Sequence, residues 1–260
     1  MSPSIQTRAS VAERPELASQ IEALIASVWP TYFLYAHPYP NDGMIDWGGI
    51  YRRWPQLQLA LFEDRTLIAA ANSIPLAWDD APEALPNDGW DWAMRQGRED
   101  LEAGRTPKTL CGLSVTIARD RQGEGLSSLM LRWMHAVGRE HGMERLIVPV
   151  RPAHKARYPH TPMAEYANWT NSDGLPQDPW IRTHIRIGGR IVKPCNAAMR
   201  MSGTVAEWSE WLGNPIPASG FYIAPDLLTP LVIDSQTGIG LYTEPNLWII
   251  HGEDNSHPSP

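Results

Sequence analysis

This sequence of 260 residues has little cysteine, few phenylalanines and no long apolar run. Its two cysteines, Cys111 and Cys195, have no metal-ligand spacing and make no disulfide framework, so we expect buried, reduced thiols. The longest apolar stretches fall far short of the ~20 residues that a membrane span needs. The first sixteen residues contain no apolar segment of the kind found in signal peptides. We therefore expect a cytoplasmic chain with no membrane partner.

Basic residues are outnumbered by acidic ones: 22 Lys and Arg against 29 Asp and Glu give a formal net charge of −7. No block of Lys and Arg compensates locally, which argues against a nucleic-acid partner. The acidic balance is compatible with a cationic substrate. A hydrophobic fraction of 43% indicates a globular chain with a substantial core. Twelve tryptophans are enough to line an apolar pocket as well as to fill that core.

The most informative stretch of the chain runs from Leu110 to His141. An apolar, β-branched run from Leu110 to Ile117 predicts a strand, and a polar turn follows it. From Leu126 onwards, apolar side chains recur at offsets of 3, 4, 7, 8 and 11 residues, which predicts an amphipathic helix. Gly142 is a suitable residue to end that helix. The unit is therefore strand, turn and helix.

The turn of this unit has the composition of an anion site. The first N–H groups of a helix have no intrahelical partner and carry the positive end of the helix dipole. Gly123 and Gly125 lack the Cβ atoms that would keep a phosphate from the backbone, and Arg121 adds a cation. Two glycines are also ordinary turn chemistry. A Walker loop is excluded because no Gly-Lys-Ser/Thr follows, and a dinucleotide fingerprint because Ser128 replaces its third glycine.

The same residues resemble the acyl-CoA-binding motif of the GCN5-related N-acetyltransferase superfamily. That motif is a strand, then Arg/Gln-x-x-Gly-x-Gly/Ala, then a long amphipathic helix. Gly123 and Gly125 match it, while Asp120 replaces the leading Arg/Gln. The run RLIVPV at residues 145–150 reads as the next strand. Tyr158 then retains the tyrosine of the Asn-x-x-Ala-x-x-x-Tyr pattern that often follows in the family.

The resemblance implies an α/β fold with a mixed, mostly antiparallel sheet flanked by helices. We expect an acyl-CoA-binding core at residues 1–195 with a helical insertion at 78–108. An extension at 196–251 packs on this core, and a disordered tail occupies 252–260. Outside the central unit, helices are expected at 15–28, 90–103 and 205–212, and a long loop at 31–49. Strands are expected at 4–12, 196–203, 231–234 and 246–251, together with an antiparallel pair at 56–62 and 66–75 and a hairpin of 180–187 with 190–192.

The resemblance also implies a reaction. We expect transfer of an acetyl or other short acyl group from acetyl-CoA, or another acyl-CoA, directly to the amine of a small molecule. One alternative is O-acylation or the handling of a carrier-protein thioester at the same site. Another is a non-catalytic acyl-CoA-binding module. A homodimer is left open.

The family pattern assigns residues to each part of the CoA molecule. The open edge of the strand at Val115, Thr116 and Ile117 would pair with the pantetheine amides. The pyrophosphate would lie on the turn, formed by Arg121, Gln122, Gly123, Glu124, Gly125, Leu126 and Ser127. Tyr158 is the candidate general acid, since a phenol with a pKa of about 10 suits a thiolate leaving group. A packing tyrosine is the alternative.

The general base and the acceptor site are less defined by the sequence. Members of the family often use a Glu near the central strand, or a water chain, as the base. No Glu or Asp lies within residues 110–117, so His37, His154 and His184 remain, and His184 on the expected hairpin is the candidate. Asp178 could bind a cationic acceptor. Tyr35 and His37 lie on the 31–49 loop, which often covers the acceptor in the family. No residue set has metal-ligand spacing, and His135 with Arg139 reads as a solvated helix face.

Overall fold

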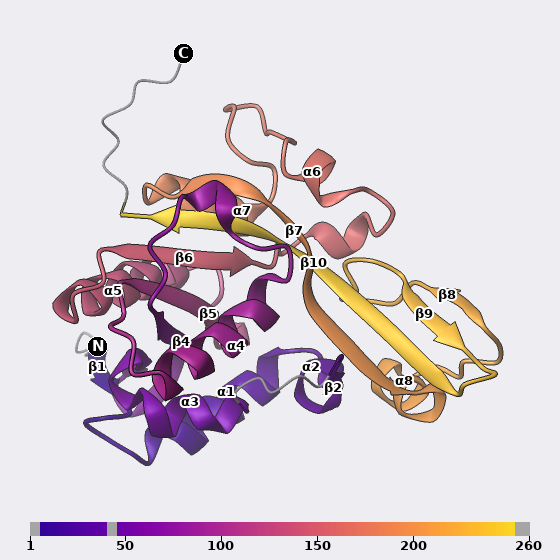
Figure 1. Cartoon of the computed structure of the whole chain (residues 1–260), viewed down its shortest axis with the longest axis horizontal. Coiled ribbons are helices and arrows are strands. Elements are labelled where there is room, and N and C mark those ends of the chain that lie inside the picture. Colours follow the sequence, from indigo (N-terminus) through magenta and orange to yellow (C-terminus); the bar gives the residue numbers. More distant parts are fainter. Residues whose placement is uncertain (1–5, 41–45, 253–260) are drawn as a thin grey trace.

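The computed structural model describes residues 6–40 and 46–252. Within these ranges the strands form one sheet in the order β1-β3-β4-β5-β6-β10-β7-β2, and β8 and β9 join it through β10 (Figure 1). The strands are β1 (Gln6–Ser10), β2 (His37–Pro38), β3 (Gln58–Glu63), β4 (Thr66–Leu76), β5 (Thr109–Ile117), β6 (Arg145–Val150), β7 (Arg190–Thr204), β8 (Gly220–Tyr222), β9 (Leu231–Asp234) and β10 (Ile239–His251). Only β5 and β6 are described as a parallel pair. The predicted mixed, mostly antiparallel sheet is confirmed.

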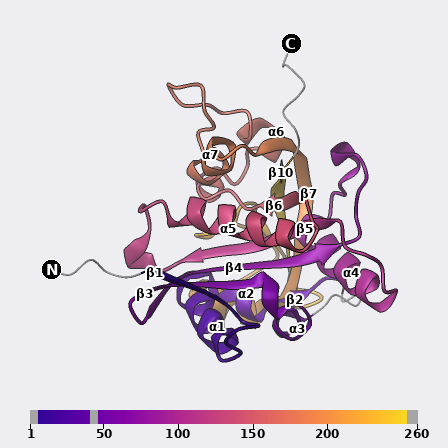
Figure 2. The ribbon, with the colours of Figure 1, turned by 90° about the vertical axis from the view of Figure 1, so that its left-hand side faces the viewer.

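Helices cover both faces of this sheet. They are α1 (Leu17–Val28), α2 (Thr31–Tyr35), α3 (Trp47–Arg53), α4 (Gly89–Glu102), α5 (Leu126–Glu140), α6 (Met163–Tyr166), α7 (Pro179–Arg186) and α8 (Val205–Leu212), with short 3₁₀ turns that include η4 (Lys155–Arg157). Figure 2 shows α5 and α7 on one side of the sheet and α1 and α3 on the other. In the described ranges, no helix is both long and apolar enough to cross a membrane.

The central strand and helix pack as their periodicity predicts. The helix α5 buries Leu126, Met130, Met134 and Val137 against the sheet. It comes very close to β5, because a Cβ on Gly112 would lie 3.1 Å from the sulfur of Met134. The strand, turn and helix predicted for residues 110–141 are therefore confirmed, and the turn is held rigidly between two buried elements.

The insertion at residues 78–108 is packed on the sheet and is not a solvated helix. Its helix α4 buries Ala93, Met94 and Gly97. Gly97 lies against Ile74 of β4, and Gly89 at the start of α4 lies against β7. The insertion therefore crosses the sheet from β7 to β4.

The last third of the chain extends the sheet instead of forming a separate layer. The long strands β7 and β10 continue beyond the core and, with β8, β9 and α8, form a lobe (Figure 1). A second buried cluster fills this lobe and includes Trp208, Tyr242 and Tyr32, the last from α2. The boundary expected at residue 195 falls inside β7. The lobe is thus joined to the core by continuous strands and by α2.

One predicted element is wrong. Residues 180–187 form the helix α7 and not the first strand of a hairpin. The Asp178 side chain accepts hydrogen bonds from the N–H groups of Trp180 and Ile181, and Pro179 occupies the first turn. These are strong helix-start signals. Gly188, with a φ of 91°, lies just after the helix and does not form a hairpin turn.

Other boundaries shift by smaller amounts. The loop expected at 31–49 contains α2 and β2 and ends at α3, while residues 41–45 lie outside the described part of the chain. The strands expected at 190–192 and 196–203 are one strand, β7. The first strand begins at Gln6, and residues 4 and 5 of the prediction are not described. The expected tail at 252–260 likewise lies outside the described residues, except for Gly252.

Candidate active site

The two parallel strands at the centre of the sheet part from each other. The parallel register of β5 and β6 runs from Thr109↔Arg145 to Cys111↔Ile147 and then stops. Beyond that point β5 stays paired with β4, up to Ala69↔Ile117, and β6 pairs with β10, up to Leu247↔Val150. The facing edges of the two strands are therefore left without strand partners in their second halves. An extended ligand carrying amides can pair with such an edge.

A break in the β4–β5 register lies beside the opening. The register shifts between Asn72↔Ser114 and Ser73↔Gly112, so Leu113 is the extra residue of a bulge. A buried chain of side-chain hydrogen bonds fixes this point: Ser114 Oγ donates to Asn72 Oδ1 at 2.9 Å, and Asn72 Nδ2 donates to Gln58 Oε1 at 3.0 Å. A bulge bends the strand and increases its twist, which turns β5 away from β6.

The turn between β5 and α5 is open where an anion would have to approach. Gly125 is the N-cap residue of α5 with a φ of 78°, and no side chain caps the helix. Gly123 has a φ of 86°, and a Cβ built on either glycine would meet nothing within 4 Å. Left-handed backbone at both positions explains the need for glycine. No side chain therefore caps the first N–H groups of α5, and the space beside both glycines is open.

Arg121 does not extend freely into this turn. Its guanidinium lies 2.6 Å from Glu63 on β3 and 2.9 Å from Glu124, so it joins the turn to the sheet. Arg119 makes a similar connection, donating to the carbonyl oxygens of Ser27 and Val28 at the end of α1. Both arginines therefore connect the turn to neighbouring elements, and their guanidinium groups are engaged by partners of this chain.

The remaining predicted CoA contacts lie along the same edge and turn. Val115 and Ile117 are half-buried on β5. Thr116 is buried, and its hydroxyl accepts a 2.8 Å hydrogen bond from the Trp29 indole, so only its backbone is available to a ligand. Gln122 Nε2 reaches back to the Ile117 carbonyl at 3.5 Å. Leu126 is buried and Ser127 half-buried at the start of α5.

Tyr158 follows β6 through the short turn η4 and is exposed. Its side chain is 44% accessible, and its ring packs edge-on against Trp169 at 4.8 Å. Its hydroxyl has no hydrogen-bond partner among the described residues. The buried Lys155 fixes its backbone, because Nζ donates to the Tyr158 carbonyl at 2.7 Å and to the Leu228 carbonyl at 2.9 Å. Burial lowers the pKa of Lys155 to about 8.

The structure uses Asp178 for folding. Besides capping α7, its carboxylate accepts hydrogen bonds from the N–H groups of Ala153 and His154 and from the Tyr166 hydroxyl at 2.8 Å. The side chain is 2% exposed. Since its carboxylate is buried and surrounded by donors of this chain, it does not present a negative charge to an acceptor.

His184 lies apart from the opening. It is fully buried on α7, and its Nδ1 is 2.9 Å from Nε2 of His251. His251 pairs with Leu146 at the start of β6, where the parallel register with β5 is intact. Burial keeps the pKa of His184 well below its usual value. A buried imidazole at the closed end of the strands does not reach a substrate in the opening.

The two predicted acceptor residues on the 31–49 segment are exposed. Tyr35 ends α2 with 62% of its surface accessible. His37 belongs to β2, which pairs with Ser202 at the outer edge of β7. They lie on the same side of the molecule as Tyr32, but the structure places no hydrogen bond between them and the residues at the end of β6.

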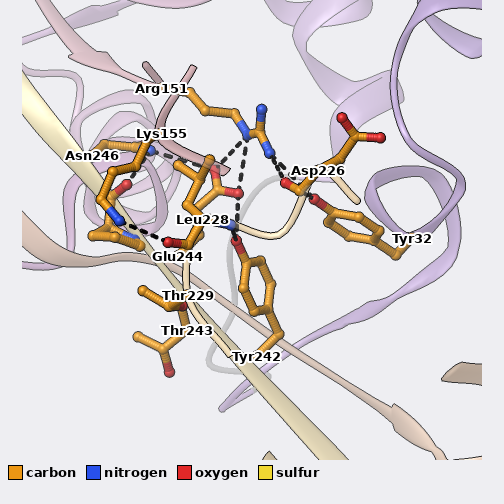
Figure 3. A network of polar contacts seen from close by, with 11 residues as sticks. Tyr32, Arg151, Lys155, Asp226, Leu228, Thr229, Tyr242, Thr243, Glu244 and Asn246 are labelled. Carbon is orange, nitrogen blue, oxygen red and sulfur yellow. Dashed lines mark hydrogen bonds and ion pairs between the residues drawn. The ribbon is translucent and has the colours of Figure 1, made fainter. Parts of the chain in front are cut away.

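A buried polar network beyond the end of β6 was not predicted (Figure 3). Arg151 donates to both carboxylate oxygens of Glu244, at 3.1 and 3.0 Å, and to the Tyr32 hydroxyl at 3.3 Å. The Tyr242 hydroxyl donates to Glu244 at 2.9 Å and accepts from the Leu228 N–H. Burial raises the pKa of Glu244 despite the neighbouring guanidinium. The network joins β6, β10, α2 and the segment around residue 228.

This network carries one exposed carboxylate at its edge. The backbone carbonyl of Asp226 accepts from the Tyr32 hydroxyl at 3.0 Å and from Arg151. Asp226 has a φ of 70°, and its side chain is exposed with no hydrogen bond or ion pair among the described residues. No sequence pattern points to this set, because residues 32, 151, 226 and 244 come from four separate segments: the pairing of β6 with β10 brings 151 near 244, and α2 and the segment before β9 add 32 and 226.

Known proteins resemble the chain in sequence and in fold. No family model matches it. The curated arginine N-acetyltransferase avaD of Aspergillus versicolor is 27% identical, over 95% of this chain and 93% of that protein. The crystal structure of the loading GNATL domain of CurA from Lyngbya majuscula has a TM-score of 0.57 at 18% identity, covering 96% of this chain and 98% of that chain. The GphF GNAT-like decarboxylase, in complex with isobutyryl-CoA, has a TM-score of 0.53 at 16% identity, covering 95% and 98%.

The two solved structures have the same fold as this chain, and the curated relative aligns with it over nearly the whole length of both. The strand, the glycine turn without a side-chain cap and the long helix are the features that the central motif predicted. Together with the similarity to the arginine N-acetyltransferase, these features support the assignment of the chain to the GCN5-related N-acetyltransferase superfamily.

Proposed function

We propose that this protein is an acyl-CoA-dependent N-acyltransferase that moves an acetyl or other short acyl group to the amine of a small molecule. The observation that carries the proposal is the open glycine turn at the head of α5, next to the unpaired edge of β5. An anion fits there because both glycine positions have free space and the helix N–H groups lack a side-chain cap. The sequence relationship to an arginine N-acetyltransferase supports the same activity.

The chain's own residues assign a place to each part of the reaction. The backbone N–H groups from residue 122 to 127 hold the pyrophosphate, and the edge of β5 at 115–117 pairs with the pantetheine. The acyl group then enters the gap between β5 and β6. A backbone N–H of residues 114–116 polarises its carbonyl, as an oxyanion site does.

Transfer breaks the thioester C–S bond and forms an amide C–N bond. The acceptor amine must be uncharged when it attacks, and its proton finally appears on the thiol. Tyr158 is the proposed donor of the proton to the leaving thiolate, since its hydroxyl is exposed and has no partner in the described chain. The acyl group passes directly from CoA to the amine while both are bound in a ternary complex.

The acceptor is proposed to be a small amine that carries a second positive charge. The curated relative acts, by its name, on arginine. Tyr32 and Arg151 hold the backbone carbonyl of Asp226 beside the end of β6, and the carboxylate of Asp226 is exposed. It replaces Asp178 as the proposed cation contact, because the carboxylate of Asp178 is enclosed by its own hydrogen bonds.

Gly125→Ala is expected to weaken CoA binding at least tenfold, because its Cβ would point into the space that the pyrophosphate needs. Gly142→Ala is the matched control. Gly142 has the same φ of 78° at the other end of α5 and also has nothing within 4 Å of a built Cβ. Both variants should lose a similar ~1 kcal/mol of stability. Calorimetric titration with CoA measures the difference, and equal affinities in the two variants would contradict the cradle.

Tyr158→Phe is expected to reduce kcat by roughly 100-fold, the order of a general acid's contribution, and to leave CoA affinity unchanged. The measurement is thiol release from acetyl-CoA with a panel of amines and their hydroxyl counterparts. Trp169→Phe, which alters the ring packed against Tyr158, controls for packing. Unchanged turnover in Tyr158→Phe would remove the acid role. Thiol release only with hydroxyl acceptors, or CoA binding without any turnover, would favour the O-acylation or non-catalytic alternatives.

Asp226→Asn is expected to raise the KM for arginine about tenfold, the order of a charge-assisted hydrogen bond. The KM for citrulline, which has the same shape without the charge, should change little. Asp64→Asn is the control, since Asp64 also has a positive φ, of 54°, but lies in the turn between β3 and β4. Equal effects of Asp226→Asn on both acceptors would exclude a charge contact.

A further inference from the structure

A second concave site lies on the other half of α5, against α7 and the end of β10. It is a hollow of about 200 Å³ lined by Leu131, Arg132, His135, Arg139, Leu146, Ile187 and His251. Its volume is roughly that of six or seven waters, so it suits a small group. None of the lining residues is acidic.

The hollow is separate from the CoA cradle. Residue 135 is ten positions beyond Gly125 on α5, which corresponds to about 15 Å along a helix. Leu146 and His251 lie at the start of β6, where β5 and β6 are still paired, and the gap lies at the other end of these strands. A pyrophosphate on the glycine turn would therefore leave the hollow free.

Two guanidinium groups supply positive charge to the hollow. Arg132 and Arg139 lie about two turns apart on one face of α5, and both are exposed. Neither has an ion pair or a side-chain hydrogen bond among the described residues. His135 lies between them, with its Nε2 2.8 Å from the Glu144 carbonyl. Planar, unpaired guanidinium groups are suited to bind a carboxylate or a phosphate.

His251 adds a neutral donor at the buried end of the hollow. Burial lowers the pKa of His251 to about 4, and His184 beside it also stays neutral, so each imidazole carries one hydrogen. The hydrogen bond between His184 Nδ1 and His251 Nε2 uses one of these two hydrogens. The other ring nitrogen of His184, Nε2, is buried without a partner. If His251 Nε2–H donated, the hydrogen of His184 would be on Nε2 and this buried N–H would have no acceptor. If His184 Nδ1–H donates, Nε2 of His184 is an acceptor without a donor, which costs less than an unpaired N–H. The hydrogen of His251 is then on Nδ1.

This tautomer leaves the Nδ1–H of His251 without an acceptor in the described chain. An anion in the hollow can accept this hydrogen, and the two guanidinium groups that line the hollow attract it. We propose that the hollow between α5 and α7 is a second anion site, for a carboxylate or phosphate group, distinct from the CoA cradle.

The anion in the hollow has two possible sources, a free ion or a carboxylate group of this chain. The described residues end at Gly252, whose built Cβ would lie 2.9 Å from Nε2 of His135, and the sequence continues with Glu253 and Asp254. The experiment must therefore separate an added anion from these two carboxylates.

The test is equilibrium dialysis of inorganic phosphate against the full-length protein saturated with CoA. Arg132→Gln/Arg139→Gln should weaken saturable phosphate binding at least tenfold. Arg52→Gln/Arg53→Gln, on α3, changes the net charge equally on the other face of the sheet and should leave binding unchanged.

Glu253→Gln/Asp254→Asn identifies the source. Tighter phosphate binding in this variant would show that the chain's own carboxylates compete for the hollow, and unchanged binding would indicate a free anion; both outcomes support the site. Absence of saturable binding in both the wild type and this variant, or equal loss in the two arginine variants, would overturn the proposal. None of these outcomes depends on the acyl-transfer activity.

Discussion

The parting of β5 and β6 is the constraint on which the rest of the structure depends. Two parallel strands that stayed paired along their whole length would leave no edge for a ligand and no room for an acyl group. The pairing ends at Cys111↔Ile147 because each strand follows its other neighbour, β4 through the bulge at Leu113 and β10 through Val150. The glycine turn follows directly on β5, so the gap and the anion site share one element.

The lobe is bound to the chain just after β6, next to this gap. Arg151, the first residue after β6, is bound by Glu244, Tyr32 and the carbonyl of Asp226, which come from three other segments (Figure 3). Removing one partner of such a buried pair typically costs about 3–5 kcal/mol, since the other charge is left unpaired. The C-terminal extension is therefore fastened to the end of β6, and it carries Asp226, the exposed carboxylate that we propose contacts the acceptor.

Local sequence signals predicted the parts that depend on neighbours in the chain. The period of apolar residues from Leu126 and the two glycines were sufficient for the strand, turn and helix, and with Tyr158 they led to the superfamily. The hairpin expected at residues 180–192 was wrong because Asp178 and Pro179 start the helix α7 there. His184 was wrongly expected at the site for the same reason, and Asp178 lies near the end of β6 but is enclosed by its own hydrogen bonds. The Arg151–Glu244 pair could not be predicted, because 93 residues separate the partners and only the β6–β10 pairing joins them.

Amide hydrogen exchange with and without CoA tests the central claim most directly. The gap and the uncapped turn predict that CoA slows exchange of the amides from residue 122 to 128 and along the edge of β5. The turn at Gly142, at the other end of the same helix, should be unaffected. Protection confined to other segments, with the 122–128 amides exchanging as fast as before, would contradict a CoA site at the head of α5.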